Sequence, residues 1–308
     1  MVNMMAVKRD PLLVIDIGGT TVKYGVWQAE QLTDKGKFMT PATWPELLVA
    51  LTQLKVRQTS AITGVAISLP GSVDPVAGKI SGTSAVSYLN DFPIKAVLTR
   101  ALGVPVSIQN DANCAALAEL WQGNAQGLDS AVFMIIGTGI GGAVVMNGQL
   151  MTGPQQFSGE FGYMVMNEQG ATLSEIGSPV KMAARFTQLE HLATSVSAQT
   201  VFRAAQAGDP VAQTCVTEMT HWLSCGAFNL SVGLNPQRVL IGGGISARPG
   251  FVADLQDQVQ RLMVAHHAPL TVDLQPCRFL NDANLIGAVA QFYAEHPASA
   301  ALSANGNE

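Results

Sequence analysis

The chain has 308 residues, of which 48% are hydrophobic, 13% charged and 6% aromatic, and its formal net charge is −5. This length exceeds the usual size of one hydrophobic core, and sparse charge with 30 glycines favours an α/β protein of two lobes over a helical bundle. The 17 lysines and arginines form no basic stripe, which excludes nucleic acid as an expected partner.

Nothing in the sequence predicts export or a membrane location. The apolar stretch that follows Lys8 and Arg9 is interrupted by Asp16 and two glycines, unlike a signal peptide. The uncharged stretch 130–159 is long enough to span a bilayer, but its repeated glycines and Pro154 favour two buried strands and a loop. The four cysteines lie far apart, as small buried residues of a reducing compartment do. We expect a cytoplasmic protein.

The first half of the chain alternates apolar strands with helical patterns. Strands at 12–17 and 22–28 form a pair around the turn Asp16-Ile17-Gly18-Gly19-Thr20. The next expected elements are a helix at 44–55, a strand at 62–69, a helix at 94–102, a strand at 104–109 and a helix at 112–121. Residues 1–9 and 297–308 are expected to be frayed tails.

The second half opens with another strand pair, at 131–136 and 143–145, around the turn Gly137-Thr138-Gly139-Ile140-Gly141-Gly142. The later expected elements are helices at 179–192, 197–206 and 209–234, a strand at 238–241, a helix at 250–264, a strand at 270–274 and a helix at 284–293. The segments VIDIGGTTVKYGVW and FMIIGTGIGGAVVM share the pattern of strand, glycine-rich turn and strand. This repetition predicts two similar lobes with a cleft between them.

Each glycine turn is a candidate phosphate cradle, because a turn without side chains lets several backbone N–H groups approach one anion. A single turn of this kind is weak evidence, since glycine hairpins often only reverse the chain. Two of them, with Asn110-Asp111 at the end of an intervening strand, indicate a nucleotide clamp facing a catalytic carboxylate. The pattern predicts phosphoryl transfer.

Six motifs in order resemble the ROK family of sugar kinases and related repressors: DIGGT at 16–20, GSVDPVAG at 71–78, NDANCAALAE at 110–119, GTGIGGA at 137–143, GEFGY at 159–163 and VLIGGGIS at 239–246. The resemblance covers nearly the whole chain. It implies a two-lobed α/β fold of the actin-like, hexokinase-like ATPase type, with the ligand cleft between the lobes. We expect an N-terminal lobe at 1–117 and a C-terminal lobe at 118–308, with the option that the last helix packs back on the N-terminal lobe.

The resemblance assigns Asp111 as the catalytic base that accepts the proton of the attacking sugar hydroxyl. A carboxylate at a helix N-terminus is a weak base, which suffices because phosphoryl transfer passes through a loose transition state. The alternative is that Asp111 only caps the helix. The neighbouring Asn110 is assigned to a sugar hydroxyl, or else closes the turn, and Gly71 is expected to contact the substrate.

The nucleotide is expected to be ATP with Mg²⁺, and Asp16 is expected to hold the metal, through water. Lys23 supplies a further positive charge or is solvated. The residues expected to contact the nucleotide are Gly18, Gly19, Thr20, Thr138, Gly139 and Gly141 at the phosphates, with Gly243 and Gly244 at the base or ribose.

Two glutamates are expected to bind the sugar. Glu160 stands in a neutral stretch and its carboxylate can accept two hydroxyls, while Glu175 matches the family's second sugar-binding glutamate by position. Family members with structural zinc have a histidine where this chain has Tyr163 and a cysteine cluster where residues 170–174 have none. No structural zinc is expected, and the changes resemble the β-glucoside kinase branch.

The sequence therefore predicts an ATP-dependent carbohydrate kinase that phosphorylates a sugar hydroxyl, the 6-hydroxyl of glucose or of a β-glucoside. Two alternatives remain: a kinase for mannose, fructose or N-acetylmannosamine, and a sugar-binding sensor without catalysis. The expected partners are a small sugar and a nucleotide, and the expected assembly is a homodimer. The first phosphate turn begins at residue 16, which leaves no helix-turn-helix extension before it and disfavours a DNA-binding repressor.

Overall fold

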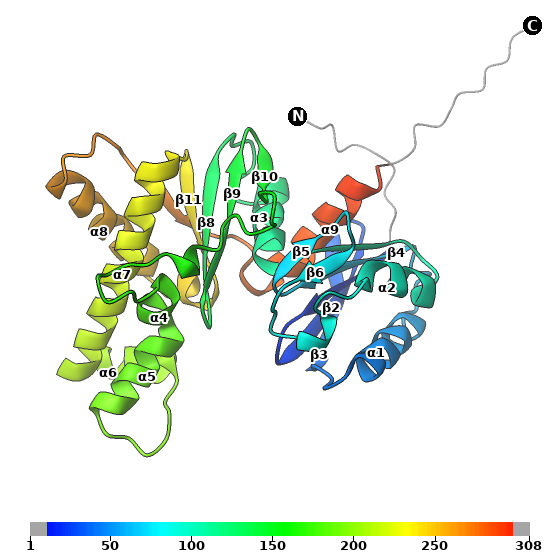
Figure 1. Cartoon of the computed structure of the whole chain (residues 1–308), viewed down its shortest axis with the longest axis horizontal. Coiled ribbons are helices and arrows are strands. Elements are labelled where there is room, and N and C mark those ends of the chain that lie inside the picture. The colour runs from blue at the N-terminus through cyan, green and yellow to red at the C-terminus, as the bar shows by residue number, and fades with distance from the viewer. Residues whose placement is uncertain (1–10, 298–308) are drawn as a thin grey trace, which may run out of the picture. The chain divides into compact units, whose positions relative to one another are not determined.

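The computed structural model describes residues 11–297, so the predicted tails lie outside the described residues, apart from Pro297. The chain divides into two compact units (Figure 1). Of the described residues, unit 1 combines 11–118 with 284–297, and unit 2 is Glu119–Ala283. The chain therefore passes twice between the units, once within a helix that begins at Asp111 and once at the start of the last helix.

Unit 1 is built on a five-stranded mixed sheet with the order β3-β2-β1-β4-β7. Its strands are β1 (Leu12–Ile17), β2 (Thr21–Gln28), β3 (Gln31–Met39), β4 (Gly64–Leu69) and β7 (Val106–Asn110). The first three strands run antiparallel, whereas β1, β4 and β7 are parallel. A two-stranded ribbon of β5 (Ser72–Asp74) and β6 (Lys79–Ser81) follows β4.

The alternation of side chains along β1 decides which helices cover which face of the unit 1 sheet. Leu13, Ile15 and Ile17 belong to a buried cluster that also contains the apolar residues of α1 (Trp44–Val56) and α2 (Ile94–Leu102). The opposite face, which includes Leu12, is covered by α9 (Ala283–Glu295), whose Phe292 packs on Gly64 and Leu12. Asp16 shares the parity of Leu12, so its side chain points to the α9 face.

The helix α3 (Asp111–Gln122) also packs against α9. A Cβ at Gly287 would collide with the backbone of Cys114, so glycine is required where the two helices touch. This contact fixes the start of α3 and the start of α9 on the same side of the sheet.

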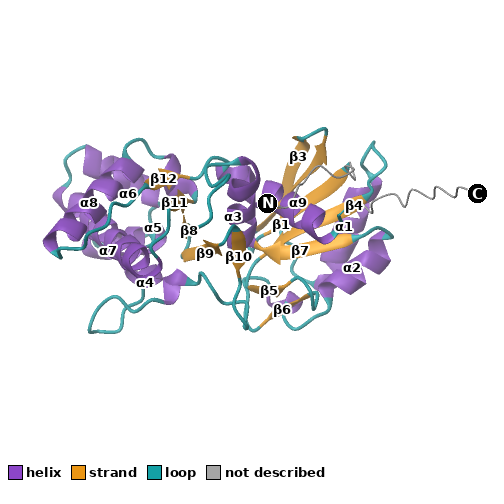
Figure 2. Cartoon of the chain, turned by 90° about the horizontal axis from the view of Figure 1, so that it is seen from above, coloured by secondary structure: helices purple, strands orange, loops and turns teal. Residues whose placement is uncertain are grey.

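Unit 2 repeats the sheet of unit 1 with the order β10-β9-β8-β11-β12 (Figure 2). Its strands are β8 (Ala131–Ile136), β9 (Ile140–Met146), β10 (Gln149–Met151), β11 (Arg238–Gly242) and β12 (Leu274–Pro276). As in unit 1, three consecutive strands form an antiparallel meander and the next two add in parallel. Its helices are α4 (Leu173–Gly177), α5 (Pro179–Leu189), α6 (Ala198–Gln206), α7 (Pro210–Leu234) and α8 (Phe251–Ala265).

Sequence patterns located most of these elements and missed those with weak apolar signals. The strand β3 was not predicted, because its outward residues are exposed and polar and it adds to β2 as an edge strand. The short β10 and α4 were also missed. The strand predicted at 270–274 lies instead at Leu274–Pro276, where its residues pair with β11. Backbone pairing, which a single segment does not reveal, decided its position.

Candidate functional site

In unit 1 the polar residues singled out by the sequence gather at the carboxyl ends of the parallel strands. Asp16 near the end of β1 pairs in register with Ser68 on β4, and Leu69 pairs with Asn110 on β7. Ligands in α/β sheets bind outside the carboxyl ends of the strands. The topology therefore brings Asp16, Asn110 and Asp111 to one edge of this sheet.

The carboxylate of Asp16 is held on one oxygen by two side-chain donors. The Ser68 hydroxyl donates to Oδ1 at 2.8 Å and the Asn284 amide donates to the same atom at 3.1 Å. The other oxygen, Oδ2, lies 3.8 Å from Nζ of Lys23 on the adjacent strand β2. Asp16 is only 7% exposed, so these contacts fix its rotamer and direct one oxygen toward the ammonium.

The first glycine turn is closed by backbone and side-chain hydrogen bonds. Gly18 N donates to Thr21 O at 3.0 Å, and the Thr40 hydroxyl donates to Gly18 O at 2.6 Å. A Cβ at Gly19 would lie 3.0 Å from the Cβ of Ala85, so a side chain at this position is crowded. Thr20 is exposed at the tip of the turn. The turn is thus rigid and bare, as close approach to an anion requires.

Asn110 caps α3 and ties it to Gly71. Its Oδ1 accepts from Asn113 N at 3.0 Å, which is the N-cap bond of the helix, and its Nδ2 donates to Gly71 O at 2.9 Å. The same amide donates to Oδ1 of Asp111 at 3.0 Å, and that oxygen also accepts from Ala112 N at 2.8 Å. The capping role left open for Asp111 therefore belongs to Asn110.

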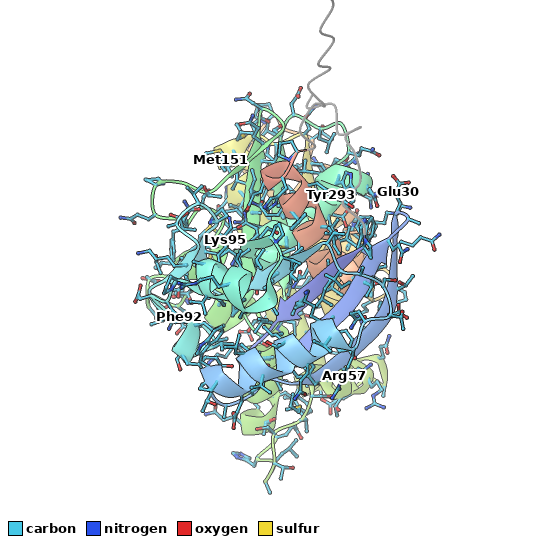
Figure 3. All side chains as sticks on the ribbon, turned by 90° about the vertical axis from the view of Figure 1, so that its right-hand side faces the viewer. Glu30, Arg57, Phe92, Lys95, Met151 and Tyr293 are labelled. Atoms are coloured by element: carbon cyan, nitrogen blue, oxygen red, sulfur yellow. The ribbon has the colours of Figure 1, made fainter. Side chains whose placement is uncertain are left out.

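A chain of polar side chains runs from the start of α3 across unit 1. Gln109 Oε1 accepts from Asn110 N and its Nε2 donates to Gln291 at 3.2 Å. Gln291 in turn donates to Glu295 at 2.8 Å, and the other oxygen of Glu295 pairs with Lys95 at 2.6 Å (Figure 3 labels Lys95). Gln109, Gln291, Glu295 and Lys95 are each joined to the next residue of this chain, which stabilises one arrangement of the helix start.

The buried thiol of Cys114, one turn after Asp111, is influenced by the charges of two carboxylates, Asp16 and Asp111. Burial raises its pKa well above the usual range, and the negative charges of Asp16 and then Asp111 raise it further. Asp16 and Asp111 therefore act on the same buried group of α3, and both belong to one acidic region of unit 1.

In unit 2 the second glycine turn has hydroxyl and backbone support and no carboxylate among its own residues. Gly137 N donates to Gly139 O at 2.9 Å, and Ile140 N donates to the Ser174 hydroxyl at 2.9 Å. Ser174 also lies against Gly139, where a Cβ would be 3.3 Å from its Oγ. Ser174, at the start of α4, thus fixes the turn that carries Thr138 and Gly141.

The segment that carries Glu160 packs directly against the strand after this turn. Gly159 has a φ of +94° and its missing Cβ leaves room for the backbone of Gly142 and Ala143. A Cβ at Gly162 would collide with Ile140 O and Ser174 Oγ. These glycines are required because two backbones touch, so the predicted sugar residue and the predicted phosphate turn are parts of one rigid assembly within unit 2.

The two predicted sugar glutamates differ in their surroundings. Burial raises the pKa of Glu160, and within the described part of the chain no hydrogen bond or ion pair reaches its carboxyl group. Glu175 forms a capping box: one carboxylate oxygen accepts from Thr172 N at 2.8 Å and from Thr172 Oγ at 2.9 Å. The backbone bond from Thr172 is the main cause that lowers the pKa of Glu175. Both carboxylate oxygens of Glu160 are therefore available to a ligand, whereas Glu175 has one of its two oxygens engaged.

The glycines after β11 have separate environments. Gly243 has a φ of +84°, and a Cβ there would collide with the carbonyl of Ile136 at the end of β8. Gly244 has open space around its Cα. Gly243 therefore packs against the strand that leads into the second turn, whereas Gly244 is accessible.

Comparison with known proteins gives the family. The ROK family profile matches residues 12–295. The chain belongs to the ROK family. It is 33% identical over 293 residues to a β-glucoside kinase of Listeria monocytogenes, covering 92% of this chain and 98% of the relative. It is 35% identical over 292 residues to a β-glucoside kinase of Klebsiella pneumoniae, covering 91% and 95%.

Among solved structures, a ROK family protein of Streptococcus pneumoniae in complex with sucrose superposes with a TM-score of 0.84 at 31% identity, covering 93% of this chain and 99% of that one. The predicted two-lobed α/β fold of the hexokinase-like type is confirmed by this similarity. None of the helices among residues 11–297 is long and apolar enough to cross a membrane.

The carboxylate of Asp16 is chemically suited to a Mg²⁺ ion held through water. Across residues 11–297 no three His, Cys, Asp or Glu side chains gather into a metal site. Mg²⁺ keeps several waters and is held by one or two carboxylates together with substrate phosphates, so a single buried carboxylate suffices. Oδ1 of Asp16 is already bonded, and Oδ2, which lies 3.8 Å from the Lys23 ammonium, has the remaining capacity to accept from a metal-bound water.

Three supporting residues were not predicted: Ser68, Asn284 and Ser174. Ser68 is the polar residue inside the apolar strand GVAISL, which is the signal that was overlooked. Asn284 is 268 positions from Asp16, and only the fold brings the two together. Tyr163 is exposed, and the four cysteines are free.

Proposed function

We propose that this protein is a β-glucoside kinase that transfers the γ-phosphate of ATP to the 6-hydroxyl of the glucose unit. The broader activity, ATP-dependent phosphorylation of a sugar, follows from relatives that are named kinases and match more than nine-tenths of the chain. The observation that carries the narrower proposal is identity of 33% and 35% to two β-glucoside kinases over more than nine-tenths of the chain.

In unit 1, Asp111 is proposed to accept the hydroxyl proton. Its Oδ1 is engaged by Asn110 and by the backbone of Ala112, so the side chain is oriented at the start of α3. A loose phosphoryl-transfer transition state requires little base strength, and the main task of such a carboxylate is to orient the nucleophile. Asn110 is proposed to support this orientation and Gly71 to position the sugar, since the two are joined by a hydrogen bond.

The first turn is proposed to bind phosphate through the backbone of Gly18, Gly19 and Thr20. Lys23 would add positive charge, because its ammonium lies beside the Asp16 carboxylate at the same strand ends. A bound Mg²⁺ would neutralise phosphate charge, and Asp16 is proposed to hold it through water.

Unit 2 is proposed to contribute phosphate and sugar contacts. Thr138, Gly139 and Gly141 would bind phosphate, and Gly243 and Gly244 would lie beside the base or ribose. Glu160 would accept hydrogen bonds from sugar hydroxyls with its carboxylate, which is supported by its half-buried position and its lack of partners among the described side chains. Glu175 would contribute through the oxygen that Thr172 does not use.

The test measures ADP release with glucose, cellobiose, mannose, fructose and N-acetylmannosamine as acceptors. We expect the highest kcat/KM for cellobiose or another β-glucoside, and NMR of the product places the phosphate on the 6-hydroxyl. A clear preference for a free monosaccharide contradicts the β-glucoside proposal, but the assignment as a sugar kinase still holds. Sugar-induced thermal stabilisation without release of ADP in the presence of any acceptor would identify a sugar-binding sensor instead.

We further propose a cytoplasmic homodimer that uses Mg²⁺ and holds no structural zinc. The four free cysteines support a reducing compartment. Light scattering after size exclusion measures the assembly, and metal analysis of purified protein measures zinc. A monomer in the first experiment, or stoichiometric zinc in the second, contradicts the corresponding proposal.

A further inference from the structure

Two aromatic side chains on the Glu160 segment are exposed and paired. Phe157 is 48% exposed and Tyr163 is 66% exposed, and their ring centroids lie 5.4 Å apart with an interplanar angle of 47°. Single exposed apolar side chains are common on protein surfaces, but a pair of touching rings left in water is a feature of binding surfaces.

The backbone places this pair around Glu160. Glu160 N donates to Phe157 O at 3.4 Å, and Tyr163 N donates to Glu160 O at 3.2 Å. Two successive turns therefore meet at Glu160, with one ring at the beginning of the first turn and the other at the end of the second. The distance between the two rings follows from these turns and needs no ligand to establish it.

The same segment is braced and almost neutral. Gly159 and Gly162 are packed against the backbone of β9 and of the second glycine turn, so the turns between Phe157 and Tyr163 have a firm support. Glu160 is the single charged residue of the sequence from 151 to 167. A neutral, rigid surface with two aromatic rings fits a neutral ring-shaped group better than an ion or a phosphate.

We propose that Phe157 and Tyr163 form an aglycone subsite, which binds the group β-linked to the glucose: an aryl group or a second glucosyl ring. This inference rests on the proposed function, in which Glu160 binds the glucose unit. The C–H face of a pyranose and the face of an aryl ring are both apolar, so either can lie on an aromatic side chain. The Tyr163 hydroxyl adds a hydrogen-bonding group at the edge of this surface.

The test compares specificity, because a structural role would lower activity with every acceptor alike. The variants are Phe157→Ala, Tyr163→Ala and Tyr163→Phe, and the acceptors are glucose, cellobiose and phenyl β-glucoside. Each alanine variant is expected to lower the ratio of kcat/KM for the β-glucosides to that for glucose by about 3- to 10-fold. Tyr163→Phe is expected to keep the parent's ratio of kcat/KM for phenyl β-glucoside to that for glucose, since the aromatic ring remains.

The matched control is Val264→Ala, which removes another exposed apolar side chain of unit 2, in α8. It is expected to leave the ratio unchanged. Saturation-transfer NMR supplies a readout without turnover: the aryl protons of phenyl β-glucoside should receive less saturation in Phe157→Ala and Tyr163→Ala than in the parent protein.

The two levels of the proposal fail in different ways. If the parent protein phosphorylates no β-glucoside, the proposed function fails. If it phosphorylates β-glucosides but the alanine variants keep the parent's acceptor ratio and its NMR saturation, the aglycone subsite is refuted and the β-glucoside kinase stands.

Discussion

The two units have sheets of the same topology but different side chains beside their glycine turns. In both, a strand turns through glycines into an antiparallel partner, and two parallel strands add on the other side. At the cross-strand position before the turn, unit 1 has Asp16 paired with Lys23, whereas unit 2 has Ile135 paired with Gly141. The repeated backbone supplies two glycine turns that are proposed to bind phosphate, and at this cross-strand position only unit 1 has charged side chains.

The contacts that hold the residues around the two turns in place also differ between the units. Asp16 is oriented by side chains from distant segments, Ser68 and Asn284. In unit 2 the close contacts are made by glycines, since Gly142, Gly159 and Gly243 each allow two backbones to touch. The orientation of Asp16 in unit 1 thus depends on side-chain chemistry, whereas these three positions of unit 2 depend on the absence of a Cβ. Deleting a functional group should disable unit 1, and adding a methyl group should disable unit 2.

The largest effect is expected for Asp111→Ala in unit 1. If Asp111 orients and deprotonates the sugar hydroxyl, kcat should fall by roughly 10²–10⁴-fold while nucleotide binding is nearly unchanged. The control is Asp254→Ala, which removes a carboxylate from the first turn of α8 in unit 2. Steady-state kinetics and nucleotide titration measure both effects. Near-normal turnover of Asp111→Ala would remove the catalytic assignment.

In unit 2 the expected counterpart is a loss of stability. Gly243→Ala combines a φ of +84° with a collision against the Ile136 carbonyl, so it should lower the free energy of unfolding by about 3 kcal/mol. The control Gly148→Ala has a φ of +69° and open space, and should cost only about 1 kcal/mol of strain. Denaturant unfolding compares them. Equal losses would show that backbone strain alone, and not the contact with Ile136, governs the position.

The sequence predicted the paired glycine turns, the strands that lead into them and the residues at the strand ends, because these signals are local. Leu12–Ile17 is an apolar strand with one aspartate near its end and is followed by glycines, and such a pattern has few other interpretations. It did not predict Asn284 as a partner of Asp16, since that contact depends on how α9 folds back on the sheet. The capping role of Asn110 was likewise decided by the geometry of β7 and α3.

A smaller effect is expected when the orientation of Asp16 is loosened. Asp16→Asn should weaken metal binding by about 10- to 100-fold, and Asn284→Ala, which frees part of Oδ1, by less. Titration with Mn²⁺ in the presence of ADP, followed by electron paramagnetic resonance, measures the affinity apart from turnover. Ile135→Val, at the equivalent position of unit 2, is the control and should leave the affinity unchanged. Unaltered Mn²⁺ binding in Asp16→Asn would place the metal elsewhere.

The smallest effect concerns the two glutamates of unit 2, whose pKa values shift in opposite directions. Burial raises the pKa of Glu160, so the native state binds its proton more tightly than the unfolded state does, and stability falls as pH rises through the raised pKa. Glu160→Gln should therefore raise Tm at pH 7 by about 1 °C, with the gain vanishing toward pH 4, and raise the KM for sugar.

The pKa of Glu175 is lowered chiefly by the backbone of Thr172, so its contribution to stability is present at neutral pH and is lost as pH falls. Glu175→Gln should thus show no gain in Tm at pH 7. Thermal unfolding of both variants at pH 4, 5.5 and 7 tests the contrast, and a gain of the same sign in both would show that the carboxylate of Glu160 has no special desolvation.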